Sequence, residues 1–335
     1  MVHTAGRTVR VGVEIAVLAL ILLLGYLSGY NGGGNLMATL LGSRTLPRWV
    51  LFPLLTVSIA VGPVIFGTQV AATIGDEIVN LERVGPEVLA AALVAAAAAI
   101  LVAWRSRVPT STSVALVGGL VGGALVHGGP AAVHWPGVIK ALLSLVLSLV
   151  SGFTVGFLVF RAVRWSLRGA SPRVGNAVAR GQYLTAALQG VGYGANDAEK
   201  TMGLLAALAV LSGVSHRFQV TWPMIALTVA TFVAGMGVGG WRVARSIGMH
   251  VFRLRPVHGL SVQLAAAATV MTAAALGGPV STTETTDAAL LGVGTAQRPS
   301  MLRWAVVRSL LLVWGVTMPL ALAVGMIVSF ILGRV

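Results

Sequence analysis

The sequence contains no cysteine, and it is short of charge. The missing thiols exclude disulfides and thiolate metal sites. Only 10% of the 335 residues are charged and 56% are hydrophobic, whereas a soluble domain carries about 25% charged residues. This shortage excludes an ordinary soluble domain and predicts an all-α polytopic membrane protein.

Common catalytic motifs are also missing. The chain has no phosphate-loop glycine motif, no HExxH sequence and no nucleophile elbow. These absences argue against ATP-driven transport by this chain and against the usual hydrolase mechanisms. We therefore expect no enzyme activity and no cofactor apart from a coupling ion.

Acidic residues are scarce, since nine acids stand against 21 arginines and two lysines, and the net charge is +14. The basic residues lie in short turns between apolar runs, which excludes a nucleic-acid partner. Arginines in such turns are typical of cytoplasmic loops that meet anionic membrane lipid. We expect a multi-pass protein of the cytoplasmic membrane.

Apolar runs of membrane-spanning length, near 20 residues, recur along the whole chain. Shorter apolar runs with polar interruptions lie between them, and together they predict about 10–12 transmembrane segments. The long runs cover residues 11–30, 49–74, 87–104, 137–160, 221–240, 259–277 and 304–332, and the short ones 112–126, 183–213 and 284–296.

Two motifs occur twice, in the same order. Gly29-Tyr30-Asn31-Gly32-Gly33-Gly34-Asn35-Leu36-Met37 is matched by Gly194-Ala195-Asn196-Asp197-Ala198-Glu199-Lys200-Thr201-Met202. Each is followed by a Pro-x-Ser-Thr-Ser/Thr run, at 109–113 and 279–283, after 80 residues in one half and 85 in the other. Two motifs repeated at nearly equal separation indicate a duplication.

The charges of two equivalent loops predict that the halves are inverted. The loop at 76–87 carries four acids and one arginine, whereas the loop at 241–255 carries four arginines and no acid. The positive-inside rule places the first loop outside and the second inside. We expect inverted repeats at 11–160 and 183–333, joined by a basic cytoplasmic linker at 161–182. Inverted repeats with broken helices are typical of transporters.

The run at 192–200 places two carboxylates, an amide and a lysine within apolar sequence. Charge at bilayer depth normally faces a cavity or a partner. The flanking glycines suit a break in a helix, which would free backbone groups to hold an ion. A short polar loop between two helices is the alternative. Glu199 and Lys200 either pair with each other or act directly, with Lys200 supplying positive charge near an anion.

The two Ser/Thr runs each follow a proline and precede a short apolar run. Proline suits the first turn of a helix, so both runs read as helix N-termini, where the dipole favours an anion. Meeting across the pseudo-two-fold axis, their hydroxyls could cradle one oxyanion; the alternative is helix capping. The predicted contacts are Ser111, Thr112, Ser113, Ser281, Thr282 and Thr283. Asn31, Asn35 and Asn196 offer amide groups to Na⁺ or to the anion, and Asp197 can hold Na⁺ or a proton.

At these motifs the chain resembles the inorganic phosphate transporter (PiT) family of cation-coupled symporters. Gly194-Ala195-Asn196-Asp197 fits that family's Gly-x-Asn-Asp run, and Pro279 to Thr283 fits its Pro-x-Ser-Thr-Thr-His run. The resemblance covers about 25–330. It implies that Asp in these motifs helps to hold a coupling cation and that the Ser/Thr runs contact phosphate. The chain departs from the family at Gly32, where the first Asp is expected, and at Val114 and Glu284, where His is expected.

Glu284 and Asp287 lie one helical turn apart and share a face. Two close carboxylates cannot both ionise cheaply, so we expect one of them to hold a proton. Our hypothesis is that they replace the acid missing at Gly32 and take part in coupling. A capping role for Glu284 near a water-exposed mouth is the alternative.

We therefore expect a secondary transporter of inorganic phosphate that works by alternating access and draws on Na⁺ or H⁺. The same fold carrying sulfate or another oxyanion is one alternative, and a non-transporting membrane sensor is another. A homodimer is compatible with the sequence, but nothing in it demonstrates one.

Overall fold

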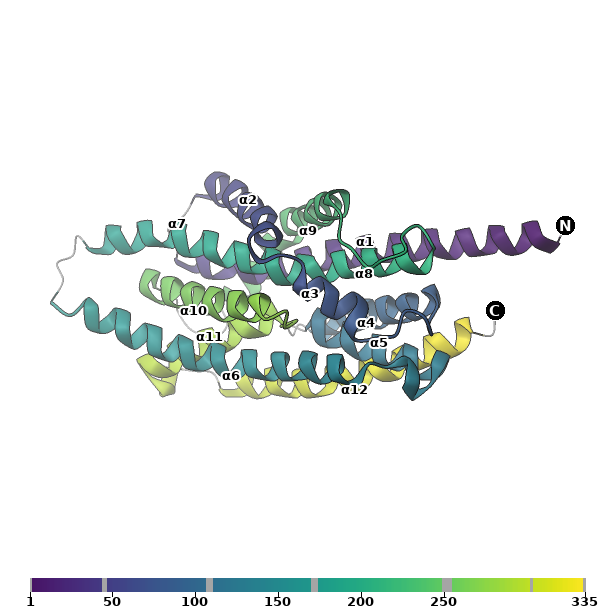
Figure 1. Ribbon diagram of the computed structural model, residues 1–335. Helices are drawn as coiled ribbons and strands as arrows, with labels where there is room; N and C mark the ends of the chain where they lie inside the picture. The colour runs from purple at the N-terminus through teal and green to yellow at the C-terminus, as the bar shows by residue number, and fades with distance from the viewer. Residues whose placement is uncertain are drawn as a thin grey trace.

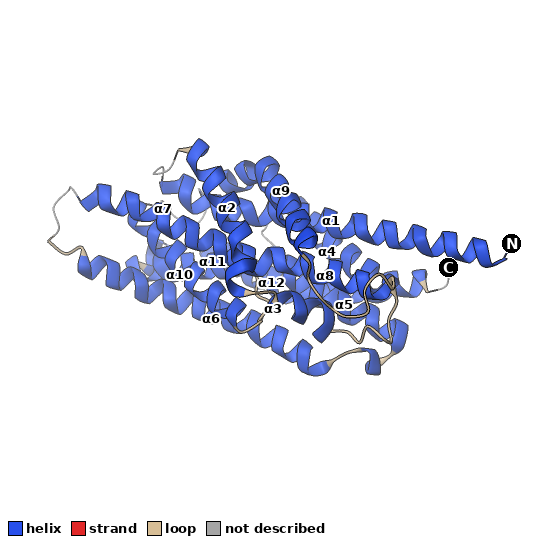
Figure 2. Cartoon of the chain, turned by 45° about the horizontal axis from the view of Figure 1, so that its top comes forward, coloured by secondary structure: helices blue, strands red, loops and turns tan. Residues whose placement is uncertain are grey.

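The computed structural model describes residues 2–43, 47–106, 111–169, 174–248, 255–301 and 304–333. Across these residues the chain is helical, and its single β contact is an isolated bridge between Val79 and Val133. Figure 2 shows the helices side by side with no strand drawn. The described part thus has the all-α class that its periodic apolar runs predict.

In its described residues the first half contains six α-helices and one π-helical turn, besides the 3-10 turn Pro130–Ala132. They are α1 (Val2–Ser43), α2 (Arg48–Phe66), α3 (Gln69–Ala72) with the π turn Thr73–Glu77, α4 (Pro86–Ser106), α5 (Thr112–Gly128) and α6 (Trp135–Ser166). The second half contains α7 (Val174–Tyr193), the π turn Gly194–Ala198, α8 (Glu199–Leu211), α9 (Trp222–Gly248), α10 (Pro256–Ala275), α11 (Thr282–Gln297) and α12 (Trp304–Leu332).

Six of the described helices contain apolar stretches long enough to cross a membrane, and two further helices are apolar but shorter. The long stretches are Val11–Gly34, Trp49–Phe66, Trp135–Ser166, Trp222–Gly240, Pro256–Ala275 and Gly315–Leu332; the shorter ones are Pro86–Val102 and Thr112–Gly128. The prediction of an all-α polytopic membrane protein is confirmed. One expected span is shorter than its apolar run at 49–74, because Gly67 adopts a positive φ of 77° that ends α2 before α3 begins.

Equivalent helices of the two halves run in opposite directions (Figure 1). α1 and α6 run from the end that holds the N-terminus toward the opposite end, whereas α7–α8 and α12 run the other way. The halves also exchange partners, since α5 packs against α12 and α11 packs against α6. The arrangement fits inverted repeats, and the boundaries given above for the repeats stay a prediction.

Glycines allow the halves to approach closely. α1 crosses α9 at Gly29 and Gly235, where an added Cβ would lie 1.9 Å from the carbonyl oxygens of Phe232 and Tyr26 respectively. No side chain fits at that distance. Such close backbone packing stabilises a helix pair in lipid, where the hydrophobic effect does not drive helices together.

The two copies of the first motif differ in backbone. α1 passes through Gly29–Met37 without interruption, whereas Gly194–Ala198 forms a π-helical turn between α7 and α8. The polar-loop alternative for this run is wrong, because residues 192–200 are helical and buried. π-helical turns inside helices occur frequently at functional sites.

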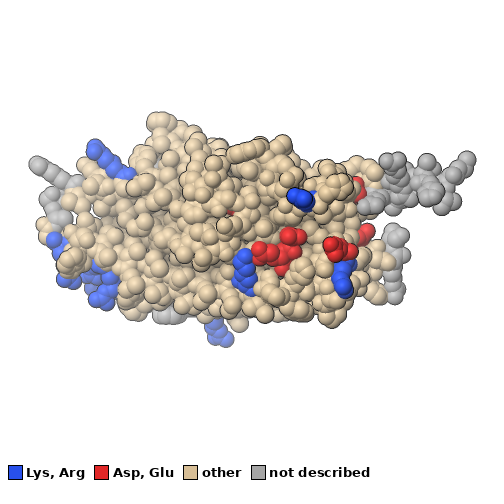
Figure 3. All heavy atoms as spheres, in the orientation of Figure 1, with Lys and Arg blue, Asp and Glu red and all other residues tan. Residues whose placement is uncertain are grey.

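Basic side chains gather without acidic ones at one end of the molecule, whereas the acidic side chains lie toward the other end together with some basic ones (Figure 3). The arginine end carries Arg161, Arg164, Arg168, Arg180, Arg255 and Arg298, and the acidic end carries Asp76, Glu77, Glu82 and Glu87. Of the loop arginines that carried the sidedness argument, Arg242, Arg245 and Arg253 have side chains outside the described part. The positive-inside rule would place the arginine end in the cytoplasm.

Candidate functional site

The two Ser/Thr runs begin α5 and α11 in the middle of the protein. Ser111 is the N-cap of α5 and accepts a hydrogen bond from the Val114 amide at 3.1 Å. Ser281 is the N-cap of α11 and accepts one from the Glu284 amide at 3.3 Å. The capping interpretation therefore holds for these two hydroxyls, and it fixes two helix N-termini in the same way in both halves.

These helix N-termini meet across the halves. The hydroxyl of Ser113 donates to the carbonyl oxygen of Val280 at 3.0 Å. Thr282 donates to Asp197, so the α11 run also contacts the second motif. Thr283 is buried, and Thr112 is half-buried. The structure thus brings the predicted hydroxyls together, while their contact with an oxyanion stays a prediction.

A buried ion pair lies at this meeting point. The Nζ atom of Lys200 lies 2.6 Å from Oδ1 of Asp197, and these side chains are 5% and 6% exposed. The ammonium also donates to Ser113 at 2.5 Å and to the Val280 carbonyl at 2.6 Å. Its three protons therefore have three acceptors, which is the condition under which a buried cation is tolerated.

Of the two alternatives for Glu199 and Lys200, pairing with each other is not what the described contacts show. Lys200 pairs with Asp197, whereas Oε2 of Glu199 accepts hydrogen bonds from the Val70 and Ala71 amides at 3.1 and 3.3 Å. These amides lie in the first turn of α3, where orphan N–H groups favour a carboxylate. Glu199 therefore anchors a short helix of the first half on the motif of the second half.

Asn196 binds backbone with both ends of its amide. Its nitrogen donates to the Gly278 carbonyl at 3.0 Å, and its oxygen accepts from the Val280 amide at 3.0 Å. The side chain therefore holds the segment that leads into α11. The sodium site predicted at Asn196 and Asp197 stays a prediction; in this structure Lys200 supplies the cation beside Asp197.

Gly32, the position of the missing family Asp, faces Asp197. A Cβ at Gly32 would lie 3.2 Å from Oδ2 of Asp197 and 3.2 Å from the ring of Tyr193. A carboxylate at this position would therefore stand directly beside another carboxylate. Asn31 is buried on α1 next to Gly32, and the side chain of Asn35 is outside the described part.

Glu284 and Asp287 lie inside the protein on the first two turns of α11, 2% and 5% exposed. Oε1 of Glu284 and Oδ2 of Asp287 have no hydrogen-bond partner among the described residues. Nearby, Gln189 donates to Thr286 at 3.3 Å, and its own oxygen is likewise unpartnered there. A buried carboxylate oxygen without a donor favours uptake of a proton or a cation. A solvent-exposed capping role for Glu284 is excluded by this burial.

A second polar network lies between this site and the acidic end. Thr73, in the first π turn, donates to the Gly277 carbonyl at 2.8 Å. Lys140 donates to Thr73 and to Glu77, both at 2.9 Å. Gly277 adjoins Gly278, which Asn196 holds. The segment from α3 through its π turn is therefore tied to the loop before α11.

Sequence reasoning missed Tyr193, Gln189, Thr73 and Lys140. The first two lie one and two turns before Asn196, on the same helix, so the helical period of the motif could have found them. Lys140 is one of only two lysines and stands in an apolar run, which is itself a signal of an intramembrane or interfacial partner. Thr73 carries no such signal.

Comparison with known proteins identifies the family of this chain. The profile of the phosphate transporter family matches residues 28–176 and again residues 167–325. A Rhizobium meliloti (strain 1021) protein described as "Probable low-affinity inorganic phosphate transporter" is 33% identical over 319 residues, covering 94% of this chain and 95% of its own. A Bacillus subtilis (strain 168) protein with the same description is 32% identical over 329 residues, covering 96% and 97%.

A solved structure titled "The sodium-dependent phosphate transporter" shares the fold, with a TM-score of 0.86 at 24% identity. The match covers 97% of this chain and all of that one. The two profile matches fall on the two halves that carry the duplicated motifs, and the relatives align over nearly their whole length. This chain belongs to the phosphate transporter family.

Proposed function

We propose that this protein is a secondary active transporter of inorganic phosphate in the cytoplasmic membrane, coupled to Na⁺ or H⁺. The observation that carries the proposal is the meeting of the α5 and α11 N-termini, from opposite halves, on the buried Asp197–Lys200 pair. Membership of the family and the names of its relatives support phosphate as the substrate.

The anion site consists of two helix N-termini and one ammonium. Helix N-termini offer unpaired amides and the positive end of a dipole. Ser111 and Ser281 hold these termini in place as caps. Ser113, Thr112, Thr282 and Thr283 present hydroxyls in the first turns of the two helices. Phosphate binds by accepting hydrogen bonds from donors, including Lys200, that now donate to acceptors of the protein.

The cation sites consist of carboxylates around that anion site. An incoming phosphate meets Asp197, Glu284 and Asp287, so anion entry requires Na⁺ or protons to offset like charge. Glu284 and Asp287 provide unpartnered oxygens, and Asn31, Asn35 and Asn196 provide amide ligands. A cation bound to the side-chain oxygen of Asn196 would displace the hydrogen bond that this oxygen accepts from the Val280 amide. The start of α11 would then be free to move. Binding and movement of the halves are thereby linked, as alternating access requires.

The test is uptake of radiolabelled phosphate into proteoliposomes under an imposed Na⁺ gradient and then under a proton gradient. Unlabelled sulfate serves as competitor, since a carboxylate such as Glu284 accepts a hydrogen bond from monohydrogen phosphate but repels sulfate. Gradient-driven uptake that resists sulfate supports the proposal, and the effective gradient identifies the coupling ion. Uptake blocked by sulfate favours a general oxyanion carrier. No uptake under either gradient favours a non-transporting sensor.

A further inference from the structure

The arginine end contains a cleft that the transport site does not use. It has a volume of about 700 Å³, within the usual range for small-molecule sites. Its polar lining comes from the end of α6, the start of α10 and the end of α11. The residues are Arg164, Arg168, Arg255, His258, Gln297 and Arg298. An adjoining cleft of about 640 Å³ shares Arg164 and Arg168 and adds Arg161 and Trp165.

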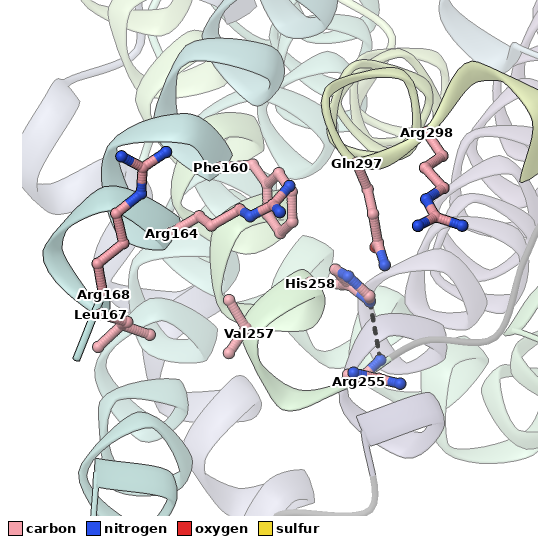
Figure 4. Close-up of a pocket in the computed structure, with 9 residues that line it drawn as sticks. All are labelled: Phe160, Arg164, Leu167, Arg168, Arg255, Val257, His258, Gln297 and Arg298. Carbon is pink, nitrogen blue, oxygen red and sulfur yellow. Dashed lines mark hydrogen bonds between the residues drawn. The ribbon is translucent and has the colours of Figure 1, made fainter. Parts of the chain in front are cut away.

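The arginines approach this cleft from opposite walls (Figure 4). Arg164 extends from α6 toward the middle of the cleft, Arg168 lies on α6 at its outer edge, and Arg298 comes from the end of α11 on the opposite side. The floor is ordered, because His258 is buried and accepts a hydrogen bond from the Arg255 amide at 3.0 Å. Gln297 reaches toward His258 between the two walls. Several guanidinium groups around one hollow match the geometry that binds phosphate groups.

Within the described ranges, no ion pair joins an acidic side chain to these arginines. Four of the nine acids lie at the acidic end, and four more lie in the central site described above. The ninth, Glu14, lies on the first part of α1, toward the acidic end. The charge of the cleft therefore calls for an anion from outside the chain.

The position of the cleft at the ends of two apolar spans favours a membrane lipid as the source of the bound anion. Two apolar spans end at its rim, since Trp135–Ser166 ends beside Leu167 and Pro256–Ala275 begins beside Arg255. Trp165, at the edge of the adjoining cleft, is 70% exposed, as expected for an aromatic residue in the headgroup region. Exposed arginines at this level meet anionic lipid headgroups.

We propose that this arginine cleft is a second phosphate-group site, separate from the transport site. It takes the phosphodiester headgroup of an anionic phospholipid or a free phosphate ion, and its position favours the lipid. A headgroup bound here bridges α6 of the first half to α10 and α11 of the second.

The test compares two matched double variants of the full chain. R164Q/R298Q removes one guanidinium from each wall, and R180Q/R308Q removes two exposed arginines that do not line the cleft. Native mass spectrometry in detergent measures binding of phosphatidylglycerol and of neutral phosphatidylcholine. Equilibrium dialysis with labelled inorganic phosphate, in neutral lipid only, counts phosphate sites per chain without any gradient.

We expect R164Q/R298Q to weaken phosphatidylglycerol binding about 25-fold, at about fivefold per arginine, and R180Q/R308Q to weaken it less than threefold. Phosphatidylcholine should bind equally well to both double variants. The charge-retaining R164K/R298K should recover part of the lipid affinity, because lysine keeps the charge but not the guanidinium fork, and a folding defect would not allow this recovery. A phosphate site lost only in R164Q/R298Q, with lipid binding unchanged, would identify free phosphate as the ligand. Equal lipid and phosphate binding in both double variants would overturn the proposal, whatever the uptake experiment shows.

Discussion

The two copies of the first motif have the same place in their halves but different chemistry. On α1 the motif is a regular helix that carries glycines and asparagines. Between α7 and α8 it is a π turn that carries Asp197, and Lys200 follows in the first turn of α8. The two meet face to face at Gly32 and Asp197. The comparison indicates that the two halves of a duplicated site can divide their roles. One half carries the charged side chains, and the glycines of the other half pack closely against them.

Removing the charge from the second motif should have the largest effect. Asp197→Asn leaves the Lys200 ammonium buried without its counter-ion, and breaking a buried pair costs about 3–5 kcal/mol. We expect phosphate uptake in proteoliposomes to fall at least 100-fold. Glu82→Gln, at the exposed acidic end, is the control and should keep wild-type uptake. An Asp197→Asn protein that retains half of the uptake would show that this carboxylate is not needed.

Restoring charge to the first motif should have the next largest effect. Gly32→Asp places a second carboxylate beside Asp197, where like charges require a further cation. We expect uptake to depend on one more Na⁺ per cycle, measured as a steeper Na⁺ dependence at fixed phosphate.

Gly32→Ala is the matched control, since it adds the same Cβ without the charge. Crowding against Tyr193 should destabilise both variants by about 1–3 kcal/mol, visible as a lower melting temperature. Identical ion dependence in the two variants would show that the missing acid does not determine coupling.

A smaller change should follow from the carboxylates of α11, which have no counterpart in α5. Glu284→Gln removes a buried proton or cation acceptor while it keeps the shape of the side chain. We expect uptake to fall less than tenfold and its pH dependence to flatten, measured from pH 5.5 to 8.5. Glu87→Gln, at the half-buried start of α4 and outside the site, is the control. An unchanged pH profile for Glu284→Gln would remove this residue from the coupling mechanism.

The smallest effect should come from the network near the acidic end. Lys140 and Glu77 form a pair whose side chains are 36% and 42% exposed, so screening limits its contribution to about 1 kcal/mol or less. Lys140→Gln should change the uptake rate less than fivefold. It should also loosen the contact between the first π turn and the loop before α11, so that a Thr283→Cys side chain reacts faster with external thiol reagents. Because the chain has no cysteine, this labelling has no background. Unchanged reactivity would show that the network does not limit access from outside to the start of α11.

Much of this site follows from the sequence, but its contacts do not. The apolar runs, the duplicated motifs and the prolines before Ser111 and Ser281 identify the helices and both N-termini, because these depend on local patterns. The contact of Gly32 with Asp197 depends on how α1 crosses the π turn, and the anchoring of α3 by Glu199 joins residues 129 positions apart. The apolar run at 49–74 gives no indication that the helix ends at Gly67, because most residues on both sides of Gly67 are apolar. Such pairings are decided by tertiary packing.

The three bonds of Lys200 have a consequence for ligand affinity. Its acceptors are part of the protein and are held in contact, so each has an effective concentration far above that of a free solute. An arriving anion therefore replaces existing bonds instead of filling an idle site. Its measured affinity is the difference between two similar sets of interactions. Weakening the internal set, for instance with Ser113→Ala, should tighten phosphate binding even though a hydroxyl is lost.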